Sequence, residues 1–316
     1  MERSVKFESR ERVGRGQLRT KGLAVLAAVW GAAVLGLAGC AVSRTSHIAA
    51  SQVPLPPMNA SAGELIADIN SQSKAVRTIT ATVDLAPTAG SVYSGVIRQY
   101  HDVRGFILAE RPDWIRMQGQ APVVRTDIFD MASDGQKFQL YIPSKQKFIV
   151  GSTAVSPSPK NSLENLRPQH IVEALLLQPV DTPKDQYFIE EAQDGSQRFY
   201  VVDILGACHG GRLFLKRKIW FDRSNLSIAR VQLYGAEGRY QEDIHYSFYE
   251  DFGGVHFPRR VDISRPVEDY SLSMTIENAT FNQDIPASKF VLKQPAMAQR
   301  VVMKTPSTPQ GDACGQ

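Results

Sequence analysis

Most of the chain beyond residue 77 alternates apolar and polar residues with a period of two. The segment Ile79-Thr80-Ala81-Thr82-Val83-Asp84-Leu85 is the first clear example. Such alternation is typical of strands that are buried on one face, because successive side chains point to opposite faces of a sheet. The pattern recurs along the chain and predicts about a dozen strands, at residues 79–85, 92–100, 103–110, 114–120, 123–131, 137–142, 147–150, 187–191, 198–205, 212–221, 228–234, 240–249, 255–264 and 270–281.

Two segments have helical spacing instead. Residues 62–76 follow Ser61, and Glu64 three positions later completes a capping box. Apolar residues then recur on one helical face, at Leu65, Ile66, Ile69 and Val76. Residues 168–178 are strongly apolar, begin with a proline that suits the first helical turn, and are followed by Pro179. The sequence therefore predicts two short helices among many strands.

Tight turns such as Asp194-Gly195 and Phe252-Gly253-Gly254 separate the strands. Short strands joined in this way predict a single antiparallel sheet that curls, and two helices are too few for a parallel α/β fold. Residues 40–60 are rich in Ser and Pro and are expected to be a flexible linker. Residues 296–316 are rich in Gln, Pro, Ser and Thr, and we expect a disordered tail there.

The N-terminal segment has the order of an export signal. Basic residues come first, an uncharged run over residues 22–39 follows, and Leu37-Ala38-Gly39-Cys40 ends it. These four positions match the lipobox of lipoprotein signal peptides. We expect residues 1–39 to be a signal peptide cleaved between Gly39 and Cys40, and Cys40 to carry the lipid. The alternative is a secretory signal or short membrane helix that ends in a cysteine by chance.

Cleavage at this position changes the charge of the protein. The 316-residue chain is 43% hydrophobic and 22% charged, which is ordinary for a globular protein with a sizeable core. Its net charge is +4. Seven Lys or Arg and three Asp or Glu precede Cys40, so the whole excess of positive charge lies in the signal. The remaining chain is neutral, which argues against a nucleic-acid partner.

Cysteine and histidine usage gives no cofactor or metal site. Cys208 and Cys314 can form a disulfide in an oxidising compartment, but sequence alone does not fix the Cα separation that a disulfide needs, so both states stay open. There is no Cys-x-x-Cys, and the six histidines are scattered. We therefore expect no metal and no cofactor.

Motifs of the common enzyme classes are also missing. The chain has no Gly-x-Ser-x-Gly, no His-Glu-x-x-His, no P-loop and no dinucleotide fingerprint. His209-Gly210-Gly211 resembles an oxyanion loop, but without a nucleophile it is more simply a tight turn. We expect a protein that is not an enzyme. An enzyme without a recognisable motif stays as a weaker alternative, in which His209 or His245 would be essential.

Several short motifs occur in an order that resembles a known family. They are Arg111-Pro112-Asp113-Trp114-Ile115-Arg116, Ser133-Asp134-Gly135 and Leu140-Tyr141-Ile142-Pro143, followed by Phe281-Asn282, Ile285-Pro286, Phe290 and Pro295. This order is similar to that of the outer-membrane lipoprotein localisation proteins, the LolA/LolB-like superfamily. The resemblance covers residues 61–295. It implies one domain, a half-open antiparallel β-barrel with the two short helices as a lid over an apolar cavity.

The resemblance implies that the cavity holds the acyl chains of lipoproteins. Acyl chains need only buried apolar area, at about 0.8 kcal/mol per methylene group. The candidate lining consists of apolar residues in the first half of the sheet that share one face of their strands. For each of them, the alternative is ordinary packing in a filled core. These candidates are Phe106, Leu108, Ile115, Met117, Phe129, Phe138 and Leu140.

Cys40 matches the membrane-anchored receptor type of this superfamily, because the carrier type is soluble and has no lipid. The receptor type hands over its cargo through an exposed apolar loop, and the connection at residues 155–159 is not strongly apolar. The residue after the lipidated cysteine is Ala41. It is not the aspartate that commonly retains lipoproteins at the inner membrane. We therefore expect a lipoprotein of the outer membrane that faces the periplasm.

The expected function is the sorting or receipt of lipoproteins, with the membrane, acyl chains and lipoproteins as partners. The alternative is an envelope-stress sensor or assembly accessory that binds a protein partner on the same scaffold.

Overall fold

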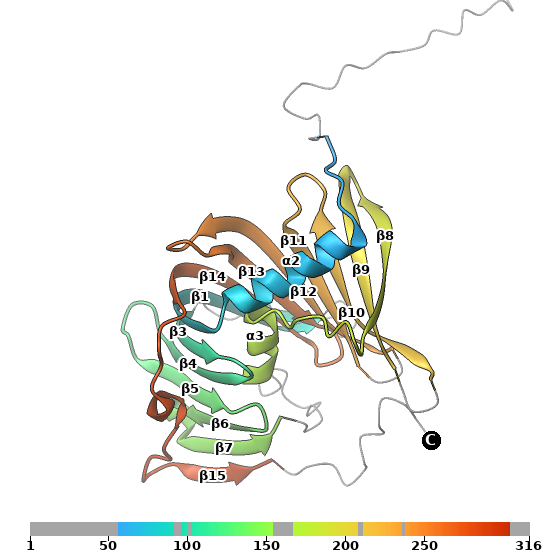
Figure 1. Ribbon diagram of the computed structural model, residues 1–316. Coiled ribbons are helices and arrows are strands. Elements are labelled where there is room, and N and C mark those ends of the chain that lie inside the picture. The colour runs from blue at the N-terminus through green and yellow to red at the C-terminus, as the bar shows by residue number, and fades with distance from the viewer. Residues whose placement is uncertain are drawn as a thin grey trace, which may run out of the picture. The chain divides into compact units, whose positions relative to one another are not determined.

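The computed structural model describes residues 56–91, 96–99, 103–153, 167–207, 211–235 and 238–303, and the chain from Pro54 onward forms one compact unit. Figure 1 labels its elements. The helices are α2 (Ala62–Ala75) and α3 (Pro168–Leu175), with 3₁₀ turns η2 (Pro143–Lys145) and η5 (Ala287–Phe290). The strands are β1 (Thr78–Ser91), β2 (Val96–Gln99), β3 (Val103–Glu110), β4 (Trp114–Gln120), β5 (Asp127–Ser133), β6 (Lys137–Ile142), β7 (Lys147–Ser152), β8 (Gln186–Asp194), β9 (Gln197–Ala207), β10 (Leu213–Asp222), β11 (Ile228–Tyr234), β12 (Tyr240–Asp251), β13 (His256–Arg265), β14 (Tyr270–Phe281) and β15 (Gln299–Val302).

Both predicted helices are confirmed, each somewhat shorter than expected at its C-terminal end. The capping box of α2 is formed: the Glu64 amide donates to Ser61 Oγ at 3.3 Å, and the Ser61 amide donates to Glu64 Oε2 at 2.7 Å. A cap of this kind stabilises a helix by about 1 kcal/mol. Pro168 occupies the first turn of α3, as its fixed φ favours. None of the helices in the described part of the chain is long and apolar enough to span a bilayer.

The strands form one sheet that does not close. Its order is β15-β7-β6-β5-β4-β3-β1-β14-β13-β12-β11-β10-β9-β8, and β2 pairs with β1. The first strand and the last long strand meet at its centre, where Ile79 lies opposite Phe281. This pairing joins the two halves of the chain into a continuous surface that curves around the helices (Figure 1). The expected mainly β, half-open architecture with two helices on one side is confirmed.

The C-terminal boundary and one pairing differ from expectation. Residues 299–302 form β15 although they lie in the segment expected to be disordered, and β15 pairs with β7 in parallel, Val301 opposite Ile149. All the other strand pairs of the described sheet are antiparallel. The composition of the tail is polar, but backbone hydrogen bonding at a free sheet edge does not require apolar side chains.

A single large core lies between the helices and one face of the sheet, which we call the inner face. It contains Leu65 and Ile69 of α2, Ile171 and Val172 of α3, and buried residues from most strands. The inner face is tightly filled near β1. A Cβ atom added at Gly105 would lie 2.7 Å from Val83 Cγ2. The first half of the sheet is therefore packed core with no room for a ligand at this point.

Candidate functional site

An apolar cavity of about 200 Å³ lies beneath the two helices. The ends of α2 and α3 form its roof with Val76, Ala174 and Leu175, and the inner faces of β11, β12 and β13 form its floor with residues such as Ile228 and Phe257. These side chains are apolar and belong to the core or its border. The cavity is thus a gap between the lid and the second half of the sheet.

Two tyrosines line the cavity with their hydroxyl groups already bonded. Tyr246 donates to the carbonyl oxygen of Ala174 at 2.8 Å, and Tyr249 donates to the carbonyl oxygen of Ile228 at 2.8 Å. Burial raises the pKa of both hydroxyls above the ordinary value. Both groups therefore stay neutral at physiological pH, and they present mainly ring carbons to a ligand.

Arg111 joins the two helices at one side of the cavity. Its Nε donates to the carbonyl oxygen of Val76, the C-cap of α2, and its Nη2 donates to the carbonyl oxygen of Leu177, just after α3, both at 2.8 Å. Carbonyl groups at helix C-termini lack partners inside the helix and carry partial negative charge, so a cation suits them. Burial lowers the pKa of Arg111, although far too little for it to lose its charge.

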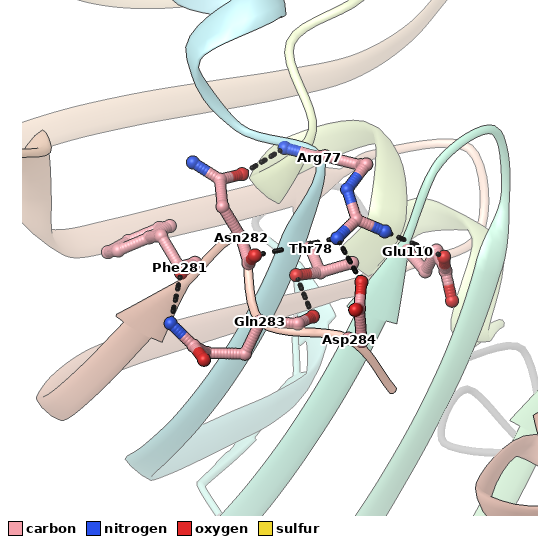
Figure 2. A network of polar contacts seen from close by, with 7 residues as sticks. All are labelled: Arg77, Thr78, Glu110, Phe281, Asn282, Gln283 and Asp284. Carbon is pink, nitrogen blue, oxygen red and sulfur yellow. Dashed lines mark hydrogen bonds and ion pairs between the residues drawn. The ribbon is translucent and has the colours of Figure 1, made fainter. Parts of the chain in front are cut away.

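Asn282 holds the end of α2 against the end of β14 (Figure 2). Its Oδ1 accepts from the backbone amide of Arg77 at 2.8 Å, and its Nδ2 donates to the carbonyl oxygen of Ala75 at 2.8 Å. Asn282 has a φ of 59°, a conformation that asparagine tolerates better than most residues. Arg77 in turn donates to Asp284 Oδ1 at 2.7 Å. Arg111 and Asn282 together fix the C-terminal end of α2.

A buried arginine holds the other end of α2. Arg223 in the turn after β10 donates from Nε to the carbonyl oxygen of Met58 at 3.2 Å and from Nη2 to Asn59 Oδ1 at 2.9 Å. Its Nη1 donates to Glu191 Oε2 at 2.6 Å, and its guanidinium lies 4.3 Å from the ring centre of Tyr200. The segment that leads into α2 is therefore docked on the sheet.

A charged cluster lies beneath α3 on the inner face. Glu242 is fully buried and pairs with Arg265, which also donates to Glu268 Oε1 at 2.7 Å. His170 of α3 forms a short hydrogen bond with Tyr270. Burial raises the pKa of Glu242 to about 8, against the attraction of Arg265. In the described ranges, no three His, Cys, Asp or Glu side chains gather where they could hold a metal ion.

Five of the seven candidate lining residues lie on the inner face. Ile115, Met117 and Phe138 are fully buried, and Phe129 and Leu140 are partly buried against the core. The strand register places them on one face, because Met117 lies opposite Met131 and Met131 lies opposite Leu140.

Phe106 and Leu108 lie on the outer face of the sheet, away from the other five candidates. They lie opposite Gln118 and Arg116, whereas Ile107 and Ala109 point into the core. Phe106 is 38% exposed. None of the seven candidates lines the cavity beneath the helices, which lies against the other half of the sheet.

Several predicted features lie outside the described residues. They are the lipobox residues Gly39 and Cys40, the cysteines Cys208 and Cys314, His209, and the connection at residues 155–159. No role for Arg111, Asn282 or Arg223 was predictable from the sequence pattern alone. Arg111 and Asn282 lie inside the Arg-Pro-Asp and Phe-Asn motifs, so these motifs were the one indication in the sequence that the two residues matter.

No family model and no curated protein matches the chain. Solved structures similar to it include the following three. A DUF1329 family protein from Desulfovibrio piger has a TM-score of 0.46 at 12% identity, over 72% of this chain and 94% of that one. A LolA superfamily protein from Nitrosomonas europaea has a TM-score of 0.45 at 12% identity, over 72% and 97%. A putative outer membrane lipoprotein-sorting protein domain from Vibrio parahaemolyticus has a TM-score of 0.45 at 11% identity, over 72% and 94%.

The last two structures bear names of the kind of protein that the sequence motifs resemble.

Proposed function

We propose that this protein binds an acyl chain, that of a lipid or of a lipoprotein, in the cavity beneath α2 and α3. The observation that carries the proposal is the cavity itself: its lining is mostly apolar, and the hydroxyl groups of Tyr246 and Tyr249 and the guanidinium of Arg111 already have partners. Its other polar lining residues are Ser71, Gln72 and His256. Such a site offers mainly buried apolar area, which suits a hydrocarbon chain at about 0.8 kcal/mol per methylene group.

Binding of a full acyl chain requires the lid to move. The cavity of about 200 Å³ is smaller than the roughly 300–1,000 Å³ of typical small-molecule pockets. Polar contacts hold α2 mainly at its C-terminal half, through Arg111, Asn282 and a pair of hydrogen bonds between Asn70 and Val180. Displacing α2 would open the floor of the cavity and expose Leu65, Ile66 and Ile69 to the incoming chain.

In this proposal the protein works at the outer membrane, where it sorts or receives lipoproteins. The lipobox at Cys40, the Ser- and Pro-rich linker over residues 40–60 and Ala41 after the cysteine support an anchored domain that faces the periplasm. The docking of Met58 and Asn59 on Arg223 would fix the point at which the linker meets the domain.

The test is binding of a fluorescent fatty acid by the full chain, with native mass spectrometry to detect lipid that co-purifies. Ala75 is at the rim of the cavity, so Ala75→Trp should block it and abolish binding. Ala67→Trp is the matched control, because Ala67 is exposed on the same helix away from the cavity. Absence of any bound lipid or probe, or equal binding by both variants, would contradict the proposal.

One observation favours a second candidate, binding of a protein partner. Strand β8 is a free edge of the described sheet, nine residues long, with Tyr187 and Phe188 exposed. Exposed edge strands of this length readily pair with another extended segment. Cross-linking in envelopes tests this: one dominant protein partner, kept after lipid removal and lost on Phe188→Lys, would favour it over the acyl-chain function.

A further inference from the structure

Phe248 has a conformation that is costly for a phenylalanine. It lies within β12 with a φ of 55°, in the left-handed region, and its side chain is 71% exposed. A bulky residue in this region is a true outlier, and exposure of its ring gives no compensating burial. Such strain is often kept where a side chain has a function.

A break in the strand pairing accompanies this conformation. Ser247 pairs with Arg260 and Tyr249 pairs with Pro258, so the register places Arg259 opposite Phe248, but no pairing forms between these two residues. The left-handed φ of Phe248 thus interrupts the ladder at one position and leaves the register unchanged. The exposed ring of Phe248 at this interruption is accessible to a ligand.

Phe248 borders a groove of about 640 Å³, a volume typical of small-molecule sites. Part of the groove lies on the outer face of the sheet, since His245 and Trp220 alternate along their strands with the buried residues Ile244 and Ile219. The groove adjoins the cavity beneath the helices, because Ile228, Tyr246, Tyr249 and His256 line both, but the acyl-chain proposal does not use Phe248 or Trp220.

A second aromatic residue, Trp220, lines the groove. Its indole N–H already donates to Gln232 Oε1 at 3.0 Å, so a ligand meets mainly ring carbons. Phe199 packs edge-on against it at 5.6 Å between ring centres, which fixes the indole plane. The Arg230 guanidinium lies over one face of the Trp220 ring, 5.3 Å from its centre, so Trp220 offers a ligand its other face and its edge. Phe248 adds a second aromatic ring to the same groove.

Planar polar side chains line the rest of the groove. They include Gln197, Asp222, Asn225, His245 and His256, which together supply both hydrogen-bond donors and acceptors. Asp222 and Asn225 each accept one backbone amide, but a hydrocarbon chain would offer nothing to the remaining donors and acceptors of this lining, which is costly. The lining therefore disfavours a lipid tail.

The charges of the groove also disfavour an anionic ligand. Its one arginine, Arg230, is held by two hydrogen bonds to Asp243, with Nε to Oδ1 at 2.6 Å and Nη2 to Oδ2 at 2.5 Å. Asp194 and Asp222 add two carboxylates. A phosphate or carboxylate ligand would meet negative charge without a free guanidinium.

We propose that this groove binds a neutral oligosaccharide. A pyranose ring has an apolar face of C–H groups, which stacks on aromatic rings, and a rim of hydroxyls that both donate and accept hydrogen bonds. Phe248 and Trp220 match the first property, and the surrounding amide, carboxylate and imidazole groups match the second.

The test is isothermal titration of the full chain, purified in a detergent without a sugar head group, against soluble oligomers of glucose and of N-acetylglucosamine. Purified peptidoglycan chains and a purified envelope glycolipid form two further arms, which separate a polymer source from a lipid-borne one. Saturable binding in any arm, lost on Phe248→Gly, supports the proposal. No saturable heat in any arm overturns it.

The variants make the test specific. Phe248→Gly should weaken binding at least about fivefold without lowering the melting temperature, because glycine accepts this φ. Phe106→Ala is the control, since Phe106 is an exposed phenylalanine of β3 outside the groove, and it should bind like the wild type. Unchanged binding by Phe248→Gly, or an equal loss in Phe106→Ala, would overturn the proposal.

Discussion

Arg111 Nε lies 2.8 Å from the carbonyl oxygen of Val76, and this contact ties the turn between β3 and β4 to the end of α2. The same guanidinium bonds the carbonyl oxygen of Leu177 after α3. One side chain therefore couples the two helices that roof the cavity, and loosening of either helix weakens the hold on the other.

Arg111→Met should loosen this roof. It removes two hydrogen bonds from a charged donor, worth about 1.5–3 kcal/mol each when buried, and we expect a loss of roughly 2–4 kcal/mol in the free energy of unfolding. Amide hydrogen exchange should become faster at the end of α2 and at residues 176–178. Arg104→Met is the control, because Arg104 is exposed on β3. If amide exchange at both helix ends stayed as slow in Arg111→Met as in the wild type, the coupling would be refuted.

Asn282 should be sensitive to substitution for two separate reasons. Asn282→Ala loses the bonds to the Arg77 amide and to the Ala75 carbonyl, and it places a Cβ-bearing residue with no polar side chain at a φ of 59°. Asn282→Gly loses only the bonds. In urea unfolding, we expect the free energy of unfolding to fall by about 2–4 kcal/mol in Asn282→Ala and by about 1–3 kcal/mol in Asn282→Gly. Asn278→Ala, an exposed asparagine of β14, should be nearly neutral.

The two faces of β3 and β4 can be separated by mutation. Met117 is fully buried on the inner face, so Met117→Ala should cost about 2–5 kcal/mol through the cavity that it leaves. Phe106→Ala on the outer face should cost less than about 1 kcal/mol. Chemical denaturation of both variants measures this difference, and a larger loss for Phe106→Ala would contradict the assigned faces.

The position of β3 was predictable from the sequence, but its orientation was not. The strand has apolar residues at both parities, and its largest side chains, Phe106 and Leu108, suggest the wrong inner face. Register with β1 decides the matter, because Gly105 lies opposite Val83, where a Cβ would clash. A small residue must point inward at this position, and that requirement comes from a neighbouring strand.

Long-range contacts also explain the other differences. Strand β15 is held by parallel pairing with residues about 150 positions earlier, a contact that local composition does not encode. The cavity, likewise, depends on how α2 and α3 sit on β11–β13. Capping, turn and alternation signals are local, which is why the helices and most strands were predictable.

Glu242 should make the protein less stable as pH rises. Its pKa in the folded protein is raised to about 8, above the value of about 4.3 for an exposed glutamate. The folded state therefore binds more protons at Glu242 between these values, so the stabilising contribution of Glu242 is fully present below about pH 4.5 and is lost as pH rises towards 8. In Glu242→Gln, the free energy of unfolding should vary less between pH 4.5 and pH 8 than in the wild type, by on the order of 2 kcal/mol. The exposed control Glu277→Gln should follow the wild type.

Arg223 should control the segment that leads into α2. Its three hydrogen bonds reach Met58, Asn59 and Glu191, and its guanidinium stacks on Tyr200. Arg223→Met keeps much of the packing but loses these bonds, so amides at residues 58–66 should exchange at least about tenfold faster, as a loss of 1.4 kcal/mol implies. Arg223→Lys should not restore protection, because a single ammonium group cannot reproduce the planar fork of donors. Arg212→Met, at an exposed position before β10, should leave exchange unchanged, and a similar acceleration in this control would show that Arg223 is not the specific cause.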